Sequence, residues 1–392
     1  MTASTMTADG SVSLGLAQAK AAFEGNAQNI SDIVDIIPSY AVARSGSSLN
    51  SQISASGTYH TAFASLVGVG SVAVSAKSAA TTSFQQFVNF YVMVDVSESM
   101  GLPSTAGETQ RLARIDPDQR DKYPNGCVVA CHFAGSQGYK LTRNGGSAAN
   151  TPVIFCQQPG TSSCIQIRLD AVGYAVQNLL KTATTQATVP NQYGVGLYPF
   201  VANLWSSYAP VTTNLSGSPA DPNSLPGKAA GLANLLDPGD NASLGSGGTH
   251  INNAVSTMNG VITTVGSGAT KASPADFVFL VTDGSQDNQE QWNGHWWGSN
   301  HATTMDPTTC QALKDRHITV AVLYIPYLPI PDPTDFANGE DYAANATIPA
   351  IPGALTACAS NGWFFTANSP TDIDAALQKM FYQAVSSVRL TS

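Results

Sequence analysis

The sequence predicts an α/β fold, a doubly wound and mostly parallel sheet with long insertions, preceded by a small N-terminal α+β region. Two observations predict it. Several apolar runs of strand length are nearly continuous, and two of them end in Asp, as is typical of strands buried on both faces of a parallel sheet. Stretches with a helical apolar stripe lie between these runs. Strands that alternate with helices form parallel sheets with right-handed crossovers.

Residues 1–88 form the predicted N-terminal region. The Ala-rich stretch Leu14–Phe23 has a helical pattern, and the apolar residues from Ile33 to Val42 indicate a strand. A helix-like turn at His60–Leu66 precedes the alternating stretch Val67–Val74, which indicates a second strand. We therefore expect one helix packed on a small antiparallel sheet.

Residues 89–392 form the predicted α/β domain. Its expected strands are Phe87–Asp95, Tyr193–Val201, Phe277–Thr282 and Ile318–Ile325. Its expected helices are Arg168–Thr182, Thr249–Val265, Cys310–His317 and a last helix from about Thr371 to Val388. Three long irregular stretches, at about 101–167, 203–246 and 326–357, are expected to decorate the domain as insertions.

Composition narrows the class of partner. Only 11% of the 392 residues are charged, the net charge is -9 and the pI is near 5.0. A nucleic-acid partner would need a clustered basic face, so we expect none. No apolar stretch has the length of a membrane span, and no signal peptide is visible. The low-charge, turn-rich composition is typical of exported proteins, so we expect any targeting or anchoring segment to be missing from this chain.

Five oxygen-bearing side chains are expected to meet at one edge of the sheet. Asp95 ends the first buried strand, and Ser97 and Ser99 follow it at a spacing of two. Thr249 follows two glycines before a helix, and Asp283 follows the third buried strand. In an open parallel sheet, ligands bind beyond the carboxyl ends of the strands, where the strand order reverses. Taken singly, the first motif is more often a helix cap and the last a turn.

Two carboxylates and three hydroxyls are all hard oxygen ligands. Such a set suits Mg²⁺, with Mn²⁺ and Ca²⁺ as less ideal alternatives, and offers nothing soft to zinc or copper. Because so few of the ligands carry charge, the ion would stay electrophilic. It would keep one coordination position open for an acidic group of a partner.

These segments resemble the von Willebrand factor A (vWA) domain and its metal-ion-dependent adhesion site (MIDAS). The resemblance rests on Tyr91–Met100, Ser246–Ile251 and Phe279–Gly284. It implies a Rossmann-like fold in which the five side chains named above are the metal site. The commonest version of the motif has Gly where this chain has Glu98, which is not a ligand position. The extra carboxylate would alter affinity or partner preference.

A narrower resemblance, to the TadG-like proteins of bacterial tight-adherence (Tad/Flp) pili, covers more of the chain. It rests on the stretch after Cys310, on Thr356–Ser360, on Trp363–Ala367 and on the final helix, together with the N-terminal Ala-rich helix. It implies a minor-pilin-like base, whose transmembrane helix is absent here, carrying a vWA domain. It also implies a Cys310–Cys358 disulfide, because cysteines recur at these two places in the family.

The other four cysteines leave two alternatives open. Cys127, Cys131, Cys156 and Cys164 lie in one Gly-, Asn- and Ser-rich stretch. The Cys127-x-x-x-Cys131-His132 spacing would suit zinc, but the second pair is too widely spaced. An even count in a loop-rich chain favours disulfides, as Cys127–Cys131 and Cys156–Cys164.

Five further side chains are candidates for a ligand-binding rim around the metal: Glu98, His250, Trp292, Trp296 and Trp297. The tryptophans follow Asp283 closely, and aromatic side chains on loops are frequent interface anchors. Packing against the domain's own side is the alternative for them. We expect His250 to cap or line the site rather than to bind the metal.

These features predict a binding protein at the bacterial surface or in the periplasm. It would use its metal to hold a surface, protein or glycan partner, and would contact other pilus subunits. The main alternative is a pilus assembly subunit in which the metal is structural. An accessory domain of a metal chelatase or ATPase would be cytosolic and poor in cysteine, which disfavours it. No nucleophile has supporting motif context, so we do not expect an enzyme.

Overall fold

The structure is a computed structural model that describes residues 12–27, 32–45, 48–61, 66, 68–83, 86–115, 165–236, 242–245, 247–288, 290–292, 295–297, 301–330, 333 and 339–391. The chain divides into two compact units. The first comprises Met1–Phe87, Gly266–Ala275 and Val385–Ser392, and the second comprises Val88–Val265 and Asp276–Ala384.

The first unit is a helix, α1 (Val12–Ala27), on a three-stranded antiparallel sheet. Its strands are β1 (Ile33–Ser45), β2 (Ser48–His60) and β3 (Ser71–Ser83), in that order. The predicted helix and antiparallel sheet are confirmed. Strand β2 was not predicted, because Ile53 is the one buried apolar side chain among those described in it, and main-chain pairing holds both of its edges instead.

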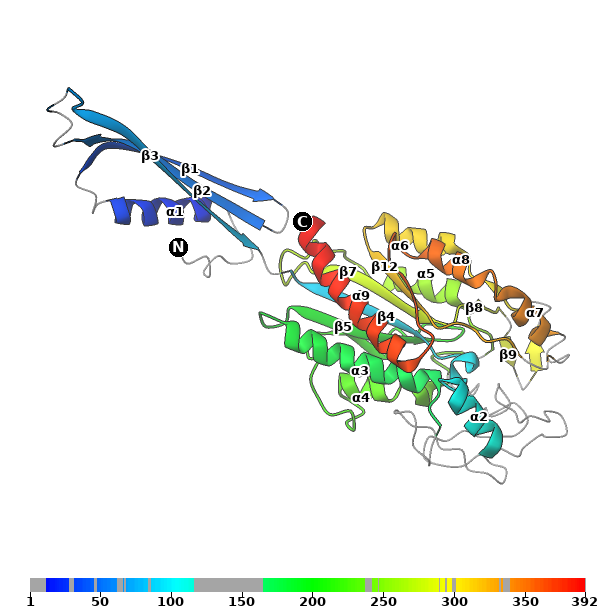
Figure 1. Ribbon diagram of the computed structural model, residues 1–392. Coiled ribbons are helices and arrows are strands. Elements are labelled where there is room, and N and C mark those ends of the chain that lie inside the picture. The colour runs from blue at the N-terminus through cyan, green and yellow to red at the C-terminus, as the bar shows by residue number, and fades with distance from the viewer. Residues whose placement is uncertain are drawn as a thin grey trace. The chain divides into compact units, whose positions relative to one another are not determined.

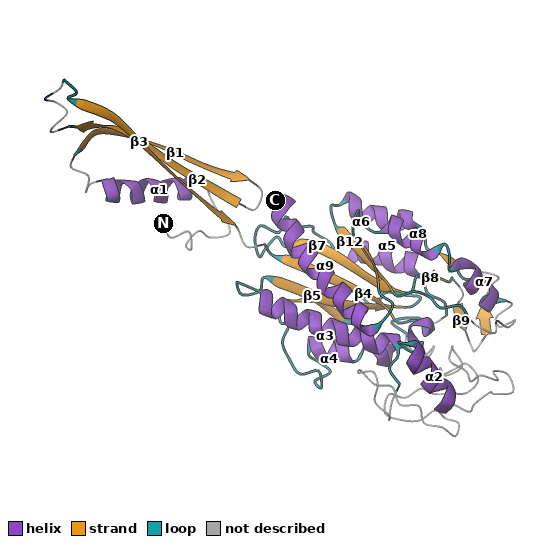
Figure 2. Ribbon diagram, viewed as in Figure 1, coloured by secondary structure: helices purple, strands orange, loops and turns teal. Residues whose placement is uncertain are grey.

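The second unit is built on a six-stranded, mostly parallel sheet (Figures 1 and 2). Its order is β13-β12-β7-β4-β5-β6, with β6 antiparallel to its neighbour. The strands are β4 (Val88–Asp95), β5 (Tyr193–Phe200), β6 (Ala209–Thr212), β7 (Ala275–Thr282), β12 (Thr319–Tyr324) and β13 (Phe364–Thr366). Every residue of β5 and nearly every residue of β7 is buried, as the continuous apolar runs predict.

Helices cover both faces of this sheet (Figure 1). One side carries α3 (Arg168–Gln186), α4 (Leu225–Ala230) and α9 (Pro370–Thr391), and the other carries α5 (Ile251–Val261), α6 (Gln311–Asp315) and α8 (Ile351–Cys358). Under α9, the ring of Phe90 packs 5.4 Å from Phe381 and 5.2 Å from Phe279. The core layer under α9 is therefore anchored on the central strands.

The three predicted insertions carry regular elements. The first holds α2 (Ala106–Ile115), the second holds β6 and α4, and the third holds α7 (Glu340–Thr347) and α8. Describing the third as decoration was wrong for α8, because Ile351, Leu355 and Cys358 are fully buried in the core. Helices this short show too few turns for their apolar stripe to stand out in the sequence.

The Cys310–Cys358 disulfide is confirmed, with a Cα–Cα separation of 5.2 Å. It joins the 3₁₀ turn Pro307–Cys310 to the last residue of α8, and both cysteines are buried. The other four cysteines lie outside the described residues. In the part of the chain that the structure describes, no helix combines the length and the apolar character needed to cross a bilayer.

Candidate metal centre

Two buried aspartates lie at the centre of the second unit's sheet, where the strand order reverses. Asp95 is the last residue of β4, and Asp283 directly follows the neighbouring strand β7. From β4 the chain proceeds outward through β5 and β6, and from β7 through β12 and β13 on the other side. Both carboxylates are fully buried. The fold thus brings them together at the edge where α/β sheets bind ligands.

Hydrogen bonds fix Asp95 in place. Its Oδ1 accepts from the backbone N–H of Ser97 at 3.0 Å and from the Ser97 hydroxyl at 2.6 Å. Its Oδ2 accepts from the Thr282 hydroxyl at 2.6 Å. The Ser97 and Ser99 hydroxyl oxygens lie 3.2 Å apart, so the turn after β4 turns both hydroxyls to one side as the spacing predicts. Thr282, which the sequence analysis did not single out, links the two strand ends.

Asp283 is less well satisfied. Among the described residues, neither of its carboxylate oxygens accepts a hydrogen bond of full geometry, although the Ser99 hydroxyl and the Ser285 N–H lie close enough to lower its pKa. Its nearest counter-charge is Arg168, whose Nη1 lies 3.6 Å from Asp283 Oδ2 and also makes no hydrogen bond in the described part of the chain. The guanidinium instead donates through Nη2 to the Pro326 carbonyl at 2.8 Å. A buried carboxylate without donors is costly unless a cation compensates it.

The electrostatics follow from burial. Desolvation and the nearby charge of Asp283 raise the pKa of Asp95 to about 7, although the hydrogen bonds from Ser97 and Thr282 oppose the shift. Desolvation also raises the pKa of Asp283, and the charge of Arg168 together with the Ser99 hydroxyl and the Ser285 N–H partly offsets that rise. Two carboxylates that resist ionisation side by side form a site at which bound positive charge is favoured.

Thr249 reaches the same place from the loop before α5. Its carbonyl accepts from the Asp287 N–H at 2.9 Å, which ties this loop to the segment after β7. A Cβ on the preceding Gly248 would collide with Asp287, so only glycine permits this close approach. Thr249 is 5% exposed and lines a cavity of about 120 Å³ together with Ser97 and Ser99. The structure therefore places the five predicted side chains beside or beneath one cavity.

Acidic side chains surround this cavity. Glu98, Asp287, Glu340 and Asp341 line it, and no Lys or Arg does among the described residues. Figure 1 shows α7, which carries two of them, at the same end of the unit as β8 (Ser285–Gln286). Asp287, Glu340 and Asp341 were not predicted from the sequence. Asp287 could have been predicted, because it lies only four residues after Asp283. Nothing in the sequence predicts that α7, with Glu340 and Asp341, returns to this edge of the sheet.

Of the side chains predicted to form a ligand-binding rim around the metal, the structure describes two. Glu98 lines the cavity, but His250 is not among its lining residues. His250 precedes α5, and its backbone N–H donates to the Val201 carbonyl at 2.9 Å. The predicted tryptophans lie on a two-stranded ribbon of β9 (Glu290–Trp292) and β10 (His295–Trp297). Their side chains lie outside the described part of the structure.

The donor set decides which metal could bind. Within the described residues, no three Asp, Glu, His or Cys side chains converge in a way that could hold a metal by themselves. A metal here would depend on the hydroxyls of Ser97, Ser99 and Thr249 and on water, besides the two aspartates. Hard oxygen ligands with retained water suit Mg²⁺.

No family model matches the chain, and no curated protein matches it. Solved structures that are similar include proximal thread matrix protein 1 of the mussel byssus, at 12% identity and a TM-score of 0.35, covering 77% of this chain and 49% of that one. They also include the PilB minor pilin of Streptococcus sanguinis, at 10% identity and a TM-score of 0.38, covering 90% and 78%. A third is the vWF domain of the type V pili tip protein Mfa5 of Porphyromonas gingivalis, at 10% and 0.38, covering 78% and 97%.

Proposed function

We propose that this protein is a binding protein that holds a divalent cation at the carboxyl edge of its second unit and uses it to bind an acidic group of a partner. The cation is Mg²⁺, with Mn²⁺ or Ca²⁺ as alternatives, and its ligands are Asp95, Ser97, Ser99, Thr249 and Asp283. The observation that carries the proposal is the Asp283 carboxylate, which is fully buried, accepts no hydrogen bond of full geometry from the described residues, and lies beneath a cavity lined by Ser97, Ser99 and Thr249.

The chain's own groups define what the cation can do. Ser97 and Thr282 hold Asp95 in one orientation, and Arg168 leaves the Asp283 oxygens unsaturated. When bound, the cation supplies an electrophilic coordination position for a carboxylate oxygen. The acidic residues around the cavity repel any anion that approaches without the cation. Partner binding should therefore depend steeply on the metal.

The strand order and the helices on both sheet faces support a doubly wound, vWA-like unit. The setting in a Tad/Flp-type pilus comes from the resemblance of the segments after Cys310 and of the N-terminal Ala-rich helix. The buried Cys310–Cys358 disulfide fits an exported, surface or periplasmic protein, since disulfides persist in oxidising compartments. In the alternative role, a pilus assembly subunit, the same cation would only stabilise the unit.

Isothermal titration of the metal-free chain with MgCl₂ tests the site. We expect Asp283→Asn to weaken Mg²⁺ binding at least about 100-fold, because it removes one of two charged ligands. Asp315→Asn is the matched control, since Asp315 is exposed at the end of α6 and bonds only locally to Gln311. Unchanged Mg²⁺ affinity in Asp283→Asn would refute the metal centre.

Retention on chemically defined surfaces tests the partner step. We expect a carboxylate-terminated monolayer to retain the protein in Mg²⁺ and to release it in EDTA, whereas a hydroxyl-terminated monolayer retains little in either condition. Asp283→Asn should behave like the EDTA-treated protein. Normal Mg²⁺ binding without metal-dependent retention would favour the structural role of the cation.

A further inference from the structure

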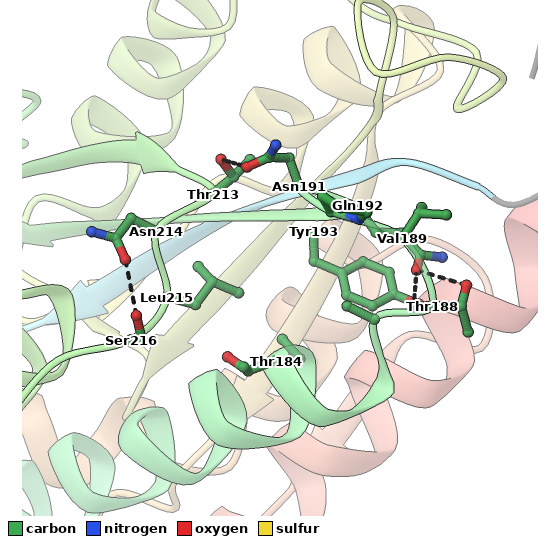
Figure 3. Close-up of a pocket in the computed structure, with 13 residues that line it drawn as sticks. Thr184, Thr188, Val189, Asn191, Gln192, Tyr193, Thr213, Asn214, Leu215 and Ser216 are labelled. Atoms are coloured by element: carbon green, nitrogen blue, oxygen red, sulfur yellow. Dashed lines mark hydrogen bonds between the residues drawn. The ribbon is translucent and has the colours of Figure 1, made fainter.

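A second cavity, drawn in Figure 3, borders the start of β5 and thus lies at the opposite end of that strand from the metal centre. It has a volume of about 380 Å³ and lies between the end of α3, the start of β5 and the segment after β6. Along β5, Phe200 pairs with Asp95 and Tyr193 pairs with Val88. The seven residue steps between these two positions separate the cavity from the metal edge by roughly 23 Å.

The lining of this cavity is entirely uncharged. None of its 13 lining residues is acidic or basic. Ala183, Tyr193 and Leu215 are buried and form an apolar floor. Exposed hydroxyl and amide side chains from three segments form the rim. A cavity without charge selects against ions, because an ion would lose hydration there without gaining a counter-charge.

The rim is already ordered by its own hydrogen bonds. The Thr213 hydroxyl donates to Asn191 Oδ1 at 2.7 Å, and the Ser216 hydroxyl donates to Asn214 Oδ1 at 3.1 Å (Figure 3). These bonds use the hydroxyl protons and the amide oxygens. They leave the hydroxyl lone pairs as acceptors and the two amide NH₂ groups as donors, for which the described residues supply no acceptor.

Alternating donors and acceptors around an apolar floor match the surface of a pyranose ring. Each sugar hydroxyl both donates and accepts, and one face of the ring presents C–H groups. A rim whose members are held in place before binding loses little entropy when it binds. The volume falls within the range of about 300–1,000 Å³ that is common for small-molecule sites.

We propose that this cavity binds one neutral pyranose residue of a glycan, independently of the metal. The proposal assigns the chain a second binding site of different chemistry. The metal centre needs an acidic group, whereas this cavity rejects one.

Two neighbouring threonines on α3 provide a matched pair of variants. Thr184 lines the cavity and Thr185 does not. Both are exposed, and each hydroxyl donates to the carbonyl four residues earlier at 2.8 Å. Thr184→Arg should fill the cavity, while Thr185→Arg places the same side chain on the neighbouring solvent-facing position. Asn191 is a poorer choice because its φ of 60° lies in the left-handed region, which few other residues tolerate.

Saturation-transfer NMR on the full chain in EDTA is the experiment. The probes are glucose, galactose, mannose and N-acetylglucosamine, with glucuronate as the anionic counterpart and N-acetylglycinamide as a neutral peptide-like amide. We expect at least one neutral sugar to bind with a dissociation constant in the range of about 1–10 mM. Thr184→Arg should raise that constant at least about tenfold, and Thr185→Arg should change it less than about twofold.

Any of four outcomes would overturn the proposal. No neutral sugar binds at about 50 mM, or Thr184→Arg and Thr185→Arg behave alike, or glucuronate or N-acetylglycinamide binds as well as the sugars. Binding that needs added Mg²⁺ would also overturn it and would point to the metal edge instead. Since the assay is run in EDTA, failure of the metal centre leaves its result unchanged.

Discussion

Arg168 is the one cationic side chain that the described structure places against the buried aspartates. Its side chain is 5% exposed, and it faces Asp283 across 3.6 Å without a hydrogen bond between them. It donates to the Pro326 carbonyl instead, so it balances charge without saturating the carboxylate. Arg168 and a bound cation would thus be in electrostatic opposition, both drawn to Asp283 and repelling each other.

Arg168→Gln should therefore have opposite effects on stability and on metal affinity. Removing one partner of a buried ion pair costs about 3 kcal/mol in the metal-free protein, because the other charge is left uncompensated. The same change removes a positive charge beside the cation, so Mg²⁺ should bind more tightly. Thermal unfolding in EDTA and calorimetric Mg²⁺ titration measure the two effects.

Lys181→Gln is the matched control, since Lys181 is exposed on the same helix. It removes one positive charge from the chain and should leave both measurements nearly unchanged. If Arg168→Gln weakened Mg²⁺ binding, the guanidinium would instead be holding the site in shape.

Glu340 gives the cavity rim a pH dependence. Burial, with Asp287 and Asp341 nearby, raises its pKa to about 8, although it accepts from the Ala302 N–H at 2.9 Å. His301 Nδ1 lies 3.1 Å from its other oxygen. The folded chain thus holds this proton more tightly than the unfolded chain does, so Glu340 costs stability as the pH rises from about 4.5 to 8.

Glu340→Gln should remove that part of the pH dependence. We expect the stability difference between the variant and the natural chain to grow by about 1–2 kcal/mol in favour of the variant between about pH 5 and pH 8.5. Urea unfolding in EDTA at the two pH values measures it. Glu24→Gln, at an exposed site on α1, controls for the loss of one carboxylate. A pH-independent difference would contradict the raised pKa.

At the scale of elements, α8 supports the metal edge from below. Gly284, directly after Asp283, has a φ of 82°, and a Cβ there would collide with Ile351 and lie 2.8 Å from Leu355 Cδ1. Both neighbours are fully buried residues of α8. The Cys310–Cys358 disulfide fixes the far end of the same helix. The turn that carries Asp283 thus packs against a helix that cannot easily move away from it.

Gly284→Ala should destabilise the chain by about 2–4 kcal/mol, from the left-handed conformation and from overpacking together. It should also weaken Mg²⁺ binding, because Asp283 moves with the turn. Gly260→Ala is the control: Gly260 lies in α5, and an added Cβ meets nothing within 4 Å. Alanine there should be neutral or stabilising by up to about 1 kcal/mol. Equal effects of the two substitutions in thermal unfolding would rule out a role for this contact.

An element could be predicted where its own residues carry an apolar pattern, and could not where main-chain pairing or a distant connection determines it. The strands β4 and β7 are largely apolar runs that end beside Asp95 and Asp283, and both follow from the sequence alone. Strand β2 reads as a polar loop because its pairing uses main-chain groups on both edges. The position of α7 over the cavity depends on a long connection after β12, which no local pattern encodes.

At the scale of the whole molecule, the two compact units differ in what holds them together. The described fully buried apolar side chains belong overwhelmingly to the second unit, and α1 and the three-stranded sheet of the first unit bury only Ala19 and Ile53 among their described side chains. The metal centre lies wholly in the second unit. The conditions that stabilise one unit should therefore leave the other unaffected.

Differential scanning calorimetry should resolve two transitions, of which the one with the smaller enthalpy belongs to the first unit. Mg²⁺ should raise the midpoint temperature of the larger transition only. At about 100 times its dissociation constant, Mg²⁺ should add about 2.7 kcal/mol to the free energy of unfolding of the second unit. In Asp283→Asn the larger transition should no longer respond to Mg²⁺. A single transition that shifts as a whole would contradict this separation. Two transitions that both shift would place a second Mg²⁺ site in the first unit.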